Sequence, residues 1–161
     1  MAAPPLTTRD LDRRFMLRAL RLARTAAGRG EVPVGAVAVR AGEVIGAASN
    51  RVEQAQDASA HAELLALRSA ARRVGSWRLV GVTLYSTLEP CPMCAGAILL
   101  ARVDRVVYGA DDPRKGAFRS AYDVLGSRSG NHHPEVAGGC EEQLAAGLLR
   151  AFFQDLRAEE S

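Results

Sequence analysis

Three side chains in this sequence can bind one metal ion, and a carboxylate lies beside one of them. His61 offers an imidazole, and Cys91 and Cys94 offer thiols three residues apart. Zinc accepts nitrogen and sulfur ligands, and three protein ligands leave a tetrahedral position open for water, as in catalytic sites. We therefore expect one Zn²⁺ per subunit, bound by His61, Cys91 and Cys94, with Glu63 as the catalytic acid and base.

The spacing within each half of this cluster favours a division of labour. Residues two apart on an ideal helix point in different directions, so His61 and Glu63 cannot both bind the ion from one side. Cys91 and Cys94, three apart, lie on one side of a helical turn. Both halves are predicted at helix N-termini, where the partial positive charge favours thiolate over thiol.

Together the two segments read H-x-E and P-C-x-x-C, a pattern typical of zinc-dependent nucleobase deaminases. In that chemistry zinc lowers the pKa of a water molecule, and Glu63 would carry protons from this water to the base and to the leaving amine. Alone, H-x-E is usually a solvated pair and C-x-x-C is often structural or redox-active, but the combination is far more specific. We interpret Glu89 as a residue that shapes the adjoining loop, not as a second base.

The elements that must position these residues alternate between strand and helix, which indicates a layered α/β domain. Residues 51–57 are predicted to form a loop, and 109–131 show no clear pattern. Apolar periodicity and capping residues predict the other elements: a helix that starts at Thr7 or Thr8 and ends near Gly28, a hairpin of 32–39 and 43–48, a helix over 60–74 capped by Asp57 or Ser59, a strand over 80–87, a helix from Pro92 to about 101, a strand over 103–108, and a helix over about 141–158.

Length and composition indicate the number of domains and the compartment of the protein. The 161 residues predict a single domain over 9–158, preceded by a disordered leader over 1–8. The apolar stretches are too short to span a membrane, and the leader lacks a secretory pattern. Three cysteines, an odd number, favour a reducing compartment, so we expect a cytoplasmic protein. Cys140 is interpreted as a small buried apolar residue without a further role.

The charge balance indicates an anionic partner only weakly. The net charge is +3, almost all of the positive charge is arginine, and Lys115 is the sole lysine. Together with the richness in alanine and glycine, this is typical of GC-rich coding. The arginines of the first helix are interpreted as a solvated face, with an RNA-facing stripe as the less favoured alternative.

Nearly the whole chain resembles bacterial tRNA-specific adenosine deaminases. The resemblance implies a three-layer α/β/α cytidine deaminase-like fold with a central five-stranded mixed sheet, and a homodimer. It implies hydrolytic deamination of adenosine to inosine at the wobble position of a tRNA anticodon stem-loop, in arginine tRNA. The segments that carry it are 31–37, 50–51, 61–63, 84–97, 105–110, Asp112, 115–117, 123–125, 131–132, 148–149 and 152–153.

The same resemblance implies roles for residues around the metal cluster. Asn50 matches the position that binds the flipped nucleotide. Val32 and the backbone of Ala62 match the walls and floor of the base pocket. Asp112 matches a residue that contacts RNA beside the target, and Lys115 and Phe153 fall in segments that resemble RNA contacts. An amide can pair with a base or ribose, and an aromatic ring can stack on an unpaired base.

Two segments, 118–120 and 126–130, depart from the family pattern and leave the fine RNA specificity open. A guanine deaminase or another free-base deaminase of the same fold is the first alternative, because it shares the Pro-Cys-Pro-Met-Cys motif. Residues 115–117, 131–132 and 152–153 favour the tRNA enzyme. A non-catalytic RNA-binding subunit with structural zinc is the second alternative, but such a subunit would not need Glu63.

Overall fold

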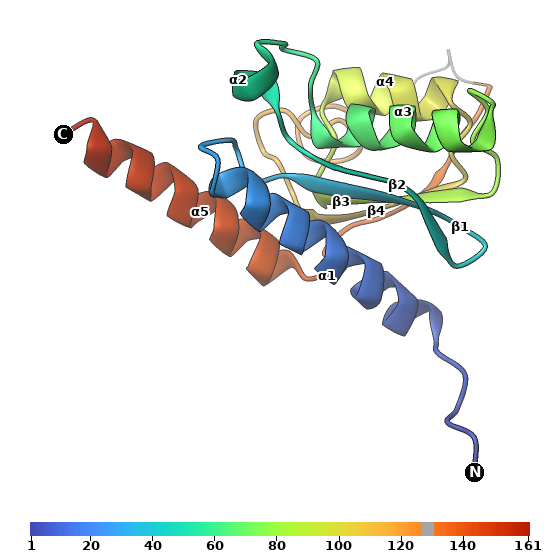
Figure 1. Cartoon of the computed structure of the whole chain (residues 1–161). Helices are drawn as coiled ribbons and strands as arrows, with labels where there is room; N and C mark the ends of the chain where they lie inside the picture. The colour runs from blue at the N-terminus through green and yellow to red at the C-terminus, as the bar shows by residue number, and fades with distance from the viewer. Residues whose placement is uncertain (127–130) are drawn as a thin grey trace.

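A five-stranded mixed sheet forms the centre of the molecule (Figure 1), whose structure is a computed structural model that describes residues 1–126 and 131–161. The strand order is β2-β1-β3-β4-β5. β1 pairs antiparallel with both β2 and β3, whereas β3, β4 and β5 are parallel. The strands are β1 (Gly35–Arg40), β2 (Glu43–Ser49), β3 (Val82–Leu88), β4 (Arg105–Ala110) and β5 (Glu135–Ala137).

Helices cover both faces of this sheet, which confirms the expected three-layer α/β/α architecture. α1 (Thr8–Ala27) and α5 (Glu142–Glu159) lie side by side on one face, and α3 (Ala62–Val74) and α4 (Pro92–Leu100) lie on the other (Figure 1). Each face buries its own apolar cluster. A short helix, α2 (Val52–Ala55), connects β2 to α3.

Glycines let two helices lie directly on the sheet backbone. A side chain at Gly35 in β1 would collide with the backbone of Ala19 in α1, and one at Gly46 in β2 would collide with the backbone of Ala66 in α3. Any larger residue would therefore push a helix away from the sheet. Because His61 directly precedes α3, this close contact also anchors the start of the metal cluster.

The helix ends agree with several predicted caps. Thr7 caps α1 and forms a reciprocal pair of hydrogen bonds with Asp10. Gly75 ends α3 with a left-handed φ of 69°, which a glycine adopts without strain. The predicted cap of α3 is wrong, because Asp57 accepts hydrogen bonds from the backbone and hydroxyl of Ser59 instead. α3 consequently begins at Ala62, two residues later than predicted.

Three further elements differ from the sequence prediction. The first strand begins at Gly35 and not at residue 32, because Pro33 has no N–H to donate to a sheet ladder. The predicted loop 51–57 contains α2, and β5 was not predicted by periodicity. Residues 127–130 of the unassigned segment lie outside the described residues. Among the helices of the described chain, none has the length and apolarity that a membrane span requires.

Candidate functional site

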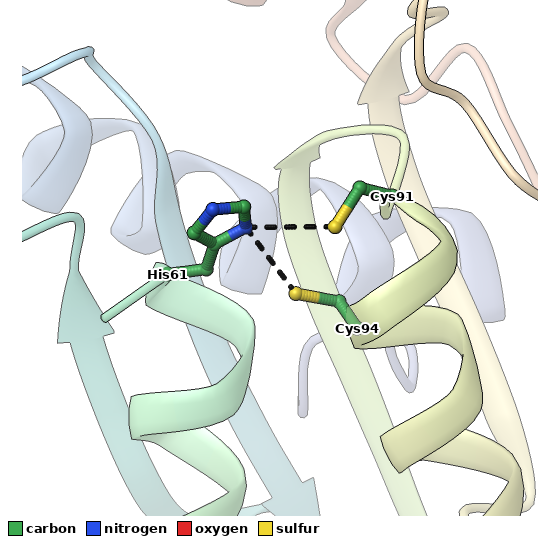
Figure 2. A group of neighbouring side chains, drawn as sticks. All are labelled: His61, Cys91 and Cys94. Carbon is green, nitrogen blue, oxygen red and sulfur yellow. Dashed lines mark hydrogen bonds between the residues drawn. The ribbon is translucent and has the colours of Figure 1, made fainter. Parts of the chain in front are cut away.

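His61, Cys91 and Cys94 converge from the N-termini of two neighbouring helices (Figure 2). His61 is the N-cap of α3, Cys91 is the N-cap of α4, and Cys94 lies in the first turn of α4. His61 Nδ1 lies 3.6 Å from Cys91 Sγ and 3.5 Å from Cys94 Sγ. All three donor atoms lie within 4.8 Å of one another. The structure thus brings together the three residues that the sequence predicted as ligands.

The geometry of these donor atoms fits a tetrahedral zinc ion. Bonds of about 2.0 Å to nitrogen and about 2.3 Å to sulfur separate the two atoms by about 3.5 Å at a tetrahedral angle. The observed separations of 3.6 and 3.5 Å match that value. One imidazole nitrogen and two sulfurs are also ligands that zinc prefers, and a fourth tetrahedral position is left over.

The two thiols differ in their readiness to ionise. A hydrogen bond from Cys94, followed by one from His61, lowers the pKa of Cys91 to about 4. The same Cys91–Cys94 interaction, together with burial, raises the pKa of Cys94. The hydrogen bond to Cys91 raises the pKa of His61 in turn. Cys91 is therefore the cysteine of the cluster that ionises more readily, and thiolate is the form of cysteine that binds metals.

Glu63 is buried in the first turn of α3, with 3% of its surface exposed. Because His61 precedes the helix in an extended conformation, the two side chains line the same cavity despite their two-residue spacing. Burial raises the pKa of Glu63 to about 7, against smaller opposing effects from a backbone hydrogen bond and from His61. The hydroxyl of Ser86 lies 3.3 Å from Glu63 Oε1. A carboxyl with a pKa near neutrality can both take up and release a proton.

A cavity of about 1180 Å³ opens over His61, Glu63 and Cys91. Ala62 does not line it and is fully buried, but its backbone N–H belongs to the first turn of α3, where helices leave N–H groups without an internal partner. The other residues that the resemblance singled out all line this cavity: Val32, Asn50, Asp112, Lys115 and Phe153.

Glu31 is a buried wall residue to which the sequence reasoning assigned no role. It is 1% exposed, and its carboxylate accepts hydrogen bonds from the backbone N–H groups of Glu53 (3.2 Å) and Gln54 (2.6 Å). These contacts hold α2 against the segment that leads into β1. Val52, the first residue of α2, and Asn50, two residues before it, line the cavity at this wall. A single acidic residue before an apolar run carries no local signal of this role.

Glu89 holds the opposite wall. Its carboxylate, 1% exposed, accepts hydrogen bonds from the backbone N–H groups of Asp112, Arg119 and Ser120 and from the Ser120 hydroxyl. Burial alone would raise the pKa of Glu89, but these hydrogen bonds hold it below its usual value. The interpretation of Glu89 as a residue that shapes the loop is therefore confirmed, and the loop carries two cavity residues, Asp112 and Lys115.

We expect Glu89→Gln to lower the free energy of unfolding by about 2–4 kcal/mol, because one buried amide cannot accept at both former oxygens and leaves backbone N–H groups unpaired. Urea unfolding measures this loss. Glu135→Gln is the matched control: this side chain is 72% exposed and pairs with Arg105 at 3.3 Å, so it should cost less than about 1 kcal/mol. Equal decreases in the free energy of unfolding of the two variants would contradict the anchoring role of Glu89.

α5 supplies the third wall of the cavity. Its predicted apolar face is only partly used for packing, since Ala145 is the one residue of this helix that is fully buried. Phe153 is 42% exposed at the cavity, and Arg150 and Arg157 line the same wall. The two rings of Phe152 and Phe153 meet edge to face with centroids 5.4 Å apart. Aromatic faces flanked by arginines are the side chains that proteins use for unpaired nucleotides.

Comparisons with known proteins agree with this geometry. Residues 9–110 match the model of the cytidine and deoxycytidylate deaminase zinc-binding region. The chain is 47% identical over 146 residues to the tRNA-specific adenosine deaminase of Bacillus subtilis (strain 168), with 91% of each chain covered. It also superposes with a TM-score of 0.83 and 45% identity on a solved structure from a study of A-to-I editing by tRNA deaminases at the wobble position, covering 84% of this chain and 99% of the other.

A guanine deaminase from Nitrosomonas europaea is more distant. It superposes with a TM-score of 0.73 and 26% identity and covers 94% of this chain and 85% of its own. The architecture is thus shared by enzymes that differ in the base on which they act, and the identity is higher to the deaminases of tRNA.

Proposed function

Because the chain belongs to the tRNA-specific adenosine deaminases of the cytidine and deoxycytidylate deaminase zinc-binding family, we propose that it converts adenosine to inosine at the wobble position of a tRNA anticodon, in arginine tRNA. One observation carries this proposal. The buried carboxyl of Glu63 lies in the same cavity as a zinc-type donor set and a wall that contains arginines and aromatic rings. Such a cavity can accept an extruded nucleotide and keep the rest of the RNA outside.

We assign His61, Cys91 and Cys94 as the ligands of one zinc ion per subunit. When bound, this zinc supplies a Lewis acid that makes a water molecule reactive near neutral pH. Because His61 and Cys91 are the N-caps of α3 and α4, one ion bound by both would hold the starts of the two helices together. The buried Cys94 keeps one side of the cluster away from solvent.

We assign Glu63 as the residue that moves protons. Its carboxylate would take a proton from the attacking water, deliver it to a ring nitrogen of the adenine, and then protonate the leaving amine, so that ammonia departs. A pKa of about 7 suits both directions of transfer, because neither the charged nor the neutral form is strongly disfavoured. The Ser86 hydroxyl donates to the carbonyl of Leu88 at 2.7 Å and lies 3.3 Å from Glu63 Oε1, where it could accept a hydrogen bond from the protonated carboxyl.

The remaining cavity residues would bind the nucleotide and its neighbours. Asn50, 7% exposed, would pair with the flipped nucleotide, and Val32 would form a wall of the base pocket. The backbone N–H of Ala62, in the first turn of α3, would lie at the floor of that pocket. Asp112 and Lys115 would contact the RNA from the loop that Glu89 anchors. Phe153 would stack on an unpaired base from α5.

The exposed apolar face of α4 supports the homodimer as part of this proposal. Met93 is 40% exposed and Leu100 is 73% exposed, and Ala97 lies between them on the same helix. A helix with apolar residues all around its axis is usually covered on every side. A second copy of the chain would cover this face, which belongs to the layer opposite α1 and α5. The tRNA substrate would place the reaction in the cytoplasm.

The purified protein should convert adenosine to inosine in an arginine-tRNA anticodon stem-loop. The product can be measured by nuclease digestion and chromatography of nucleosides, with the same stem-loop carrying guanosine at the wobble position as the control. Free guanine is the competing substrate, because the guanine deaminase shares this fold. An unmodified stem-loop together with deaminated guanine would make the free-base alternative correct. Binding of the stem-loop without deamination of any substrate would favour the non-catalytic alternative.

A further inference from the structure

α1 concentrates the positive charge of this protein on one face. It contains six arginines and two aspartates, a net charge of +4. Because the whole chain carries +3, all other residues together carry −1. A compositional excess of arginine would be spread along the sequence, so the segregation needs another explanation. The sequence analysis left an RNA-facing stripe as the less favoured interpretation of this helix.

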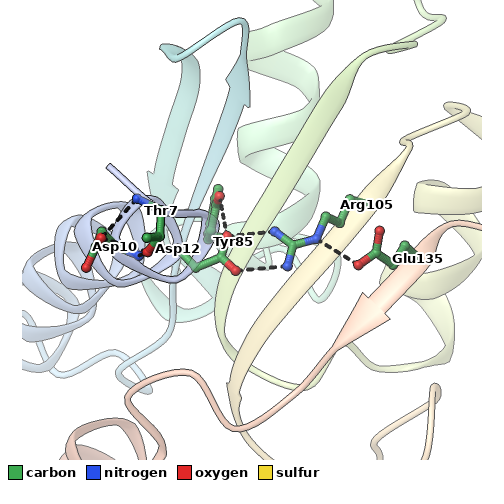
Figure 3. Close-up of polar contacts among 6 residues, drawn as sticks. All are labelled: Thr7, Asp10, Asp12, Tyr85, Arg105 and Glu135. Carbon is green, nitrogen blue, oxygen red and sulfur yellow. Dashed lines mark hydrogen bonds and ion pairs between the residues drawn. The ribbon is translucent and has the colours of Figure 1, made fainter. Parts of the chain in front are cut away.

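The two acidic side chains of α1, Asp10 and Asp12, bind residues other than the arginines of this helix (Figure 3). Asp10 accepts hydrogen bonds from the backbone and hydroxyl of Thr7 at the start of the helix. Asp12 binds the Arg105 guanidinium through both oxygens, at 2.6 and 2.8 Å, and accepts a hydrogen bond from the Tyr85 hydroxyl at 2.9 Å. Neither aspartate therefore forms an ion pair with an arginine of α1.

Arg14, Arg18 and Arg21 form a stripe on the outer surface of α1. Their spacing of four and three residues puts them on one side of the helix, and all three are exposed. Within the described part of the chain, none of them lies within ion-pair distance of a carboxylate, whereas Arg13 pairs with Glu141 at 2.9 Å. The stripe is about 10 Å long, the length over which one strand of a duplex presents about three phosphates.

The stripe lies beyond the catalytic cavity but is connected to it. α1 ends at Ala27, and Gly30 and Glu31 just after it already line the cavity. Arg21 lies six residues before that end, which corresponds to about 9 Å along the helix axis. α5, which packs beside α1, adds Arg150 and Arg157 at the cavity wall. The arginines of α1 thus lie in the same helix layer as two arginines that line the cavity.

We propose that Arg14, Arg18 and Arg21 bind the phosphate backbone of the tRNA outside the anticodon loop, as a second contact surface on the same substrate. This inference rests on the proposed function, because it assumes a tRNA whose anticodon loop occupies the cavity. An anionic membrane surface fits less well, since a membrane-bound helix needs an exposed apolar face and the apolar face of α1 is buried in the sheet.

The test compares two RNAs and two triple variants. The stripe variant is Arg14→Gln, Arg18→Gln and Arg21→Gln. The control variant is Arg68→Gln, Arg72→Gln and Arg73→Gln, which removes the same charge from exposed arginines of α3 in the opposite layer. Each protein is titrated with full-length arginine tRNA and with its isolated anticodon stem-loop, by fluorescence anisotropy over a range of salt concentrations and by deamination kinetics.

For full-length tRNA we expect the stripe variant to raise Kd and KM about tenfold with kcat unchanged, and to reduce the slope of log Kd against log salt by about 2. On the isolated stem-loop, the stripe variant should have the same Kd and KM as the wild type. The control variant should match the wild type on both RNAs. Equal losses on both RNAs, or equal losses in both triple variants, would overturn the proposal, as would unchanged tRNA binding. If the wild type deaminates neither RNA, the proposed function fails, and the anisotropy titration still decides whether the stripe binds tRNA.

Discussion

Replacing Glu63 with glutamine is expected to lower the rate of adenosine deamination by about 10³- to 10⁴-fold while zinc stays bound. Glutamine keeps the shape of the buried side chain but cannot accept and release a proton, and its amide leaves the His61, Cys91 and Cys94 donors untouched. The rate is measured in single turnovers on the stem-loop, so that product release does not mask the chemical step. Metal analysis of the same preparation measures the zinc content.

Ser86→Ala is the matched control for this variant. It removes the hydroxyl that lies 3.3 Å from Glu63 Oε1 but leaves the carboxyl in place, so the rate should fall less than about tenfold. A Glu63→Gln protein that still turns over within tenfold of the wild type would exclude Glu63 as the proton carrier. Loss of zinc together with activity would instead make Glu63 part of the metal site.

The proposed division of roles between His61 and Glu63 follows from their spacing, whereas their place in one cavity becomes visible only in the structure. On an ideal helix the two side chains would point in different directions. In the protein His61 is an extended N-cap and only Glu63 is helical, so both line one cavity. The helix start was predicted two residues too early, because the hydrogen bonds between Asp57 and Ser59 form a local turn in place of a cap.

Long-range hydrogen bonds explain what the sequence could not indicate. Glu31 accepts hydrogen bonds from two residues of α2 that lie 22 and 23 positions later in the sequence. Glu89 accepts hydrogen bonds from loop residues that lie 23 to 31 positions later. Neither carboxylate differs in its local sequence from a solvated acid. Apolar periodicity and short motifs report contacts within one element, so they predicted most helices and strands and the metal cluster. They could not predict the walls that these two buried acids hold around the cavity.

Cys94→Ala is expected to remove both the zinc and the activity. The side chain is fully buried and is one of the three proposed ligands, so its loss would leave two protein donors for the ion. Turnover should fall at least as far as in Glu63→Gln. Zinc at about 100 times its Kd stabilises a folded protein by about 2.7 kcal/mol, and this gain should disappear from the thermal unfolding of Cys94→Ala.

Cys140→Ala is the matched control, because the third cysteine is half-buried and lies outside the donor cluster. It should keep zinc, turnover and the stabilisation by added metal. Glu63→Gln should also keep the stabilisation, which separates loss of the metal from loss of the proton carrier. Since removal of a buried thiol can itself weaken packing, circular dichroism of the metal-free proteins shows whether Cys94→Ala still folds. A folded Cys94→Ala protein that binds zinc as the wild type does would exclude this thiol as a ligand. Loss of zinc from Cys140→Ala would indicate that the metal binds at Cys140 and not at the cavity.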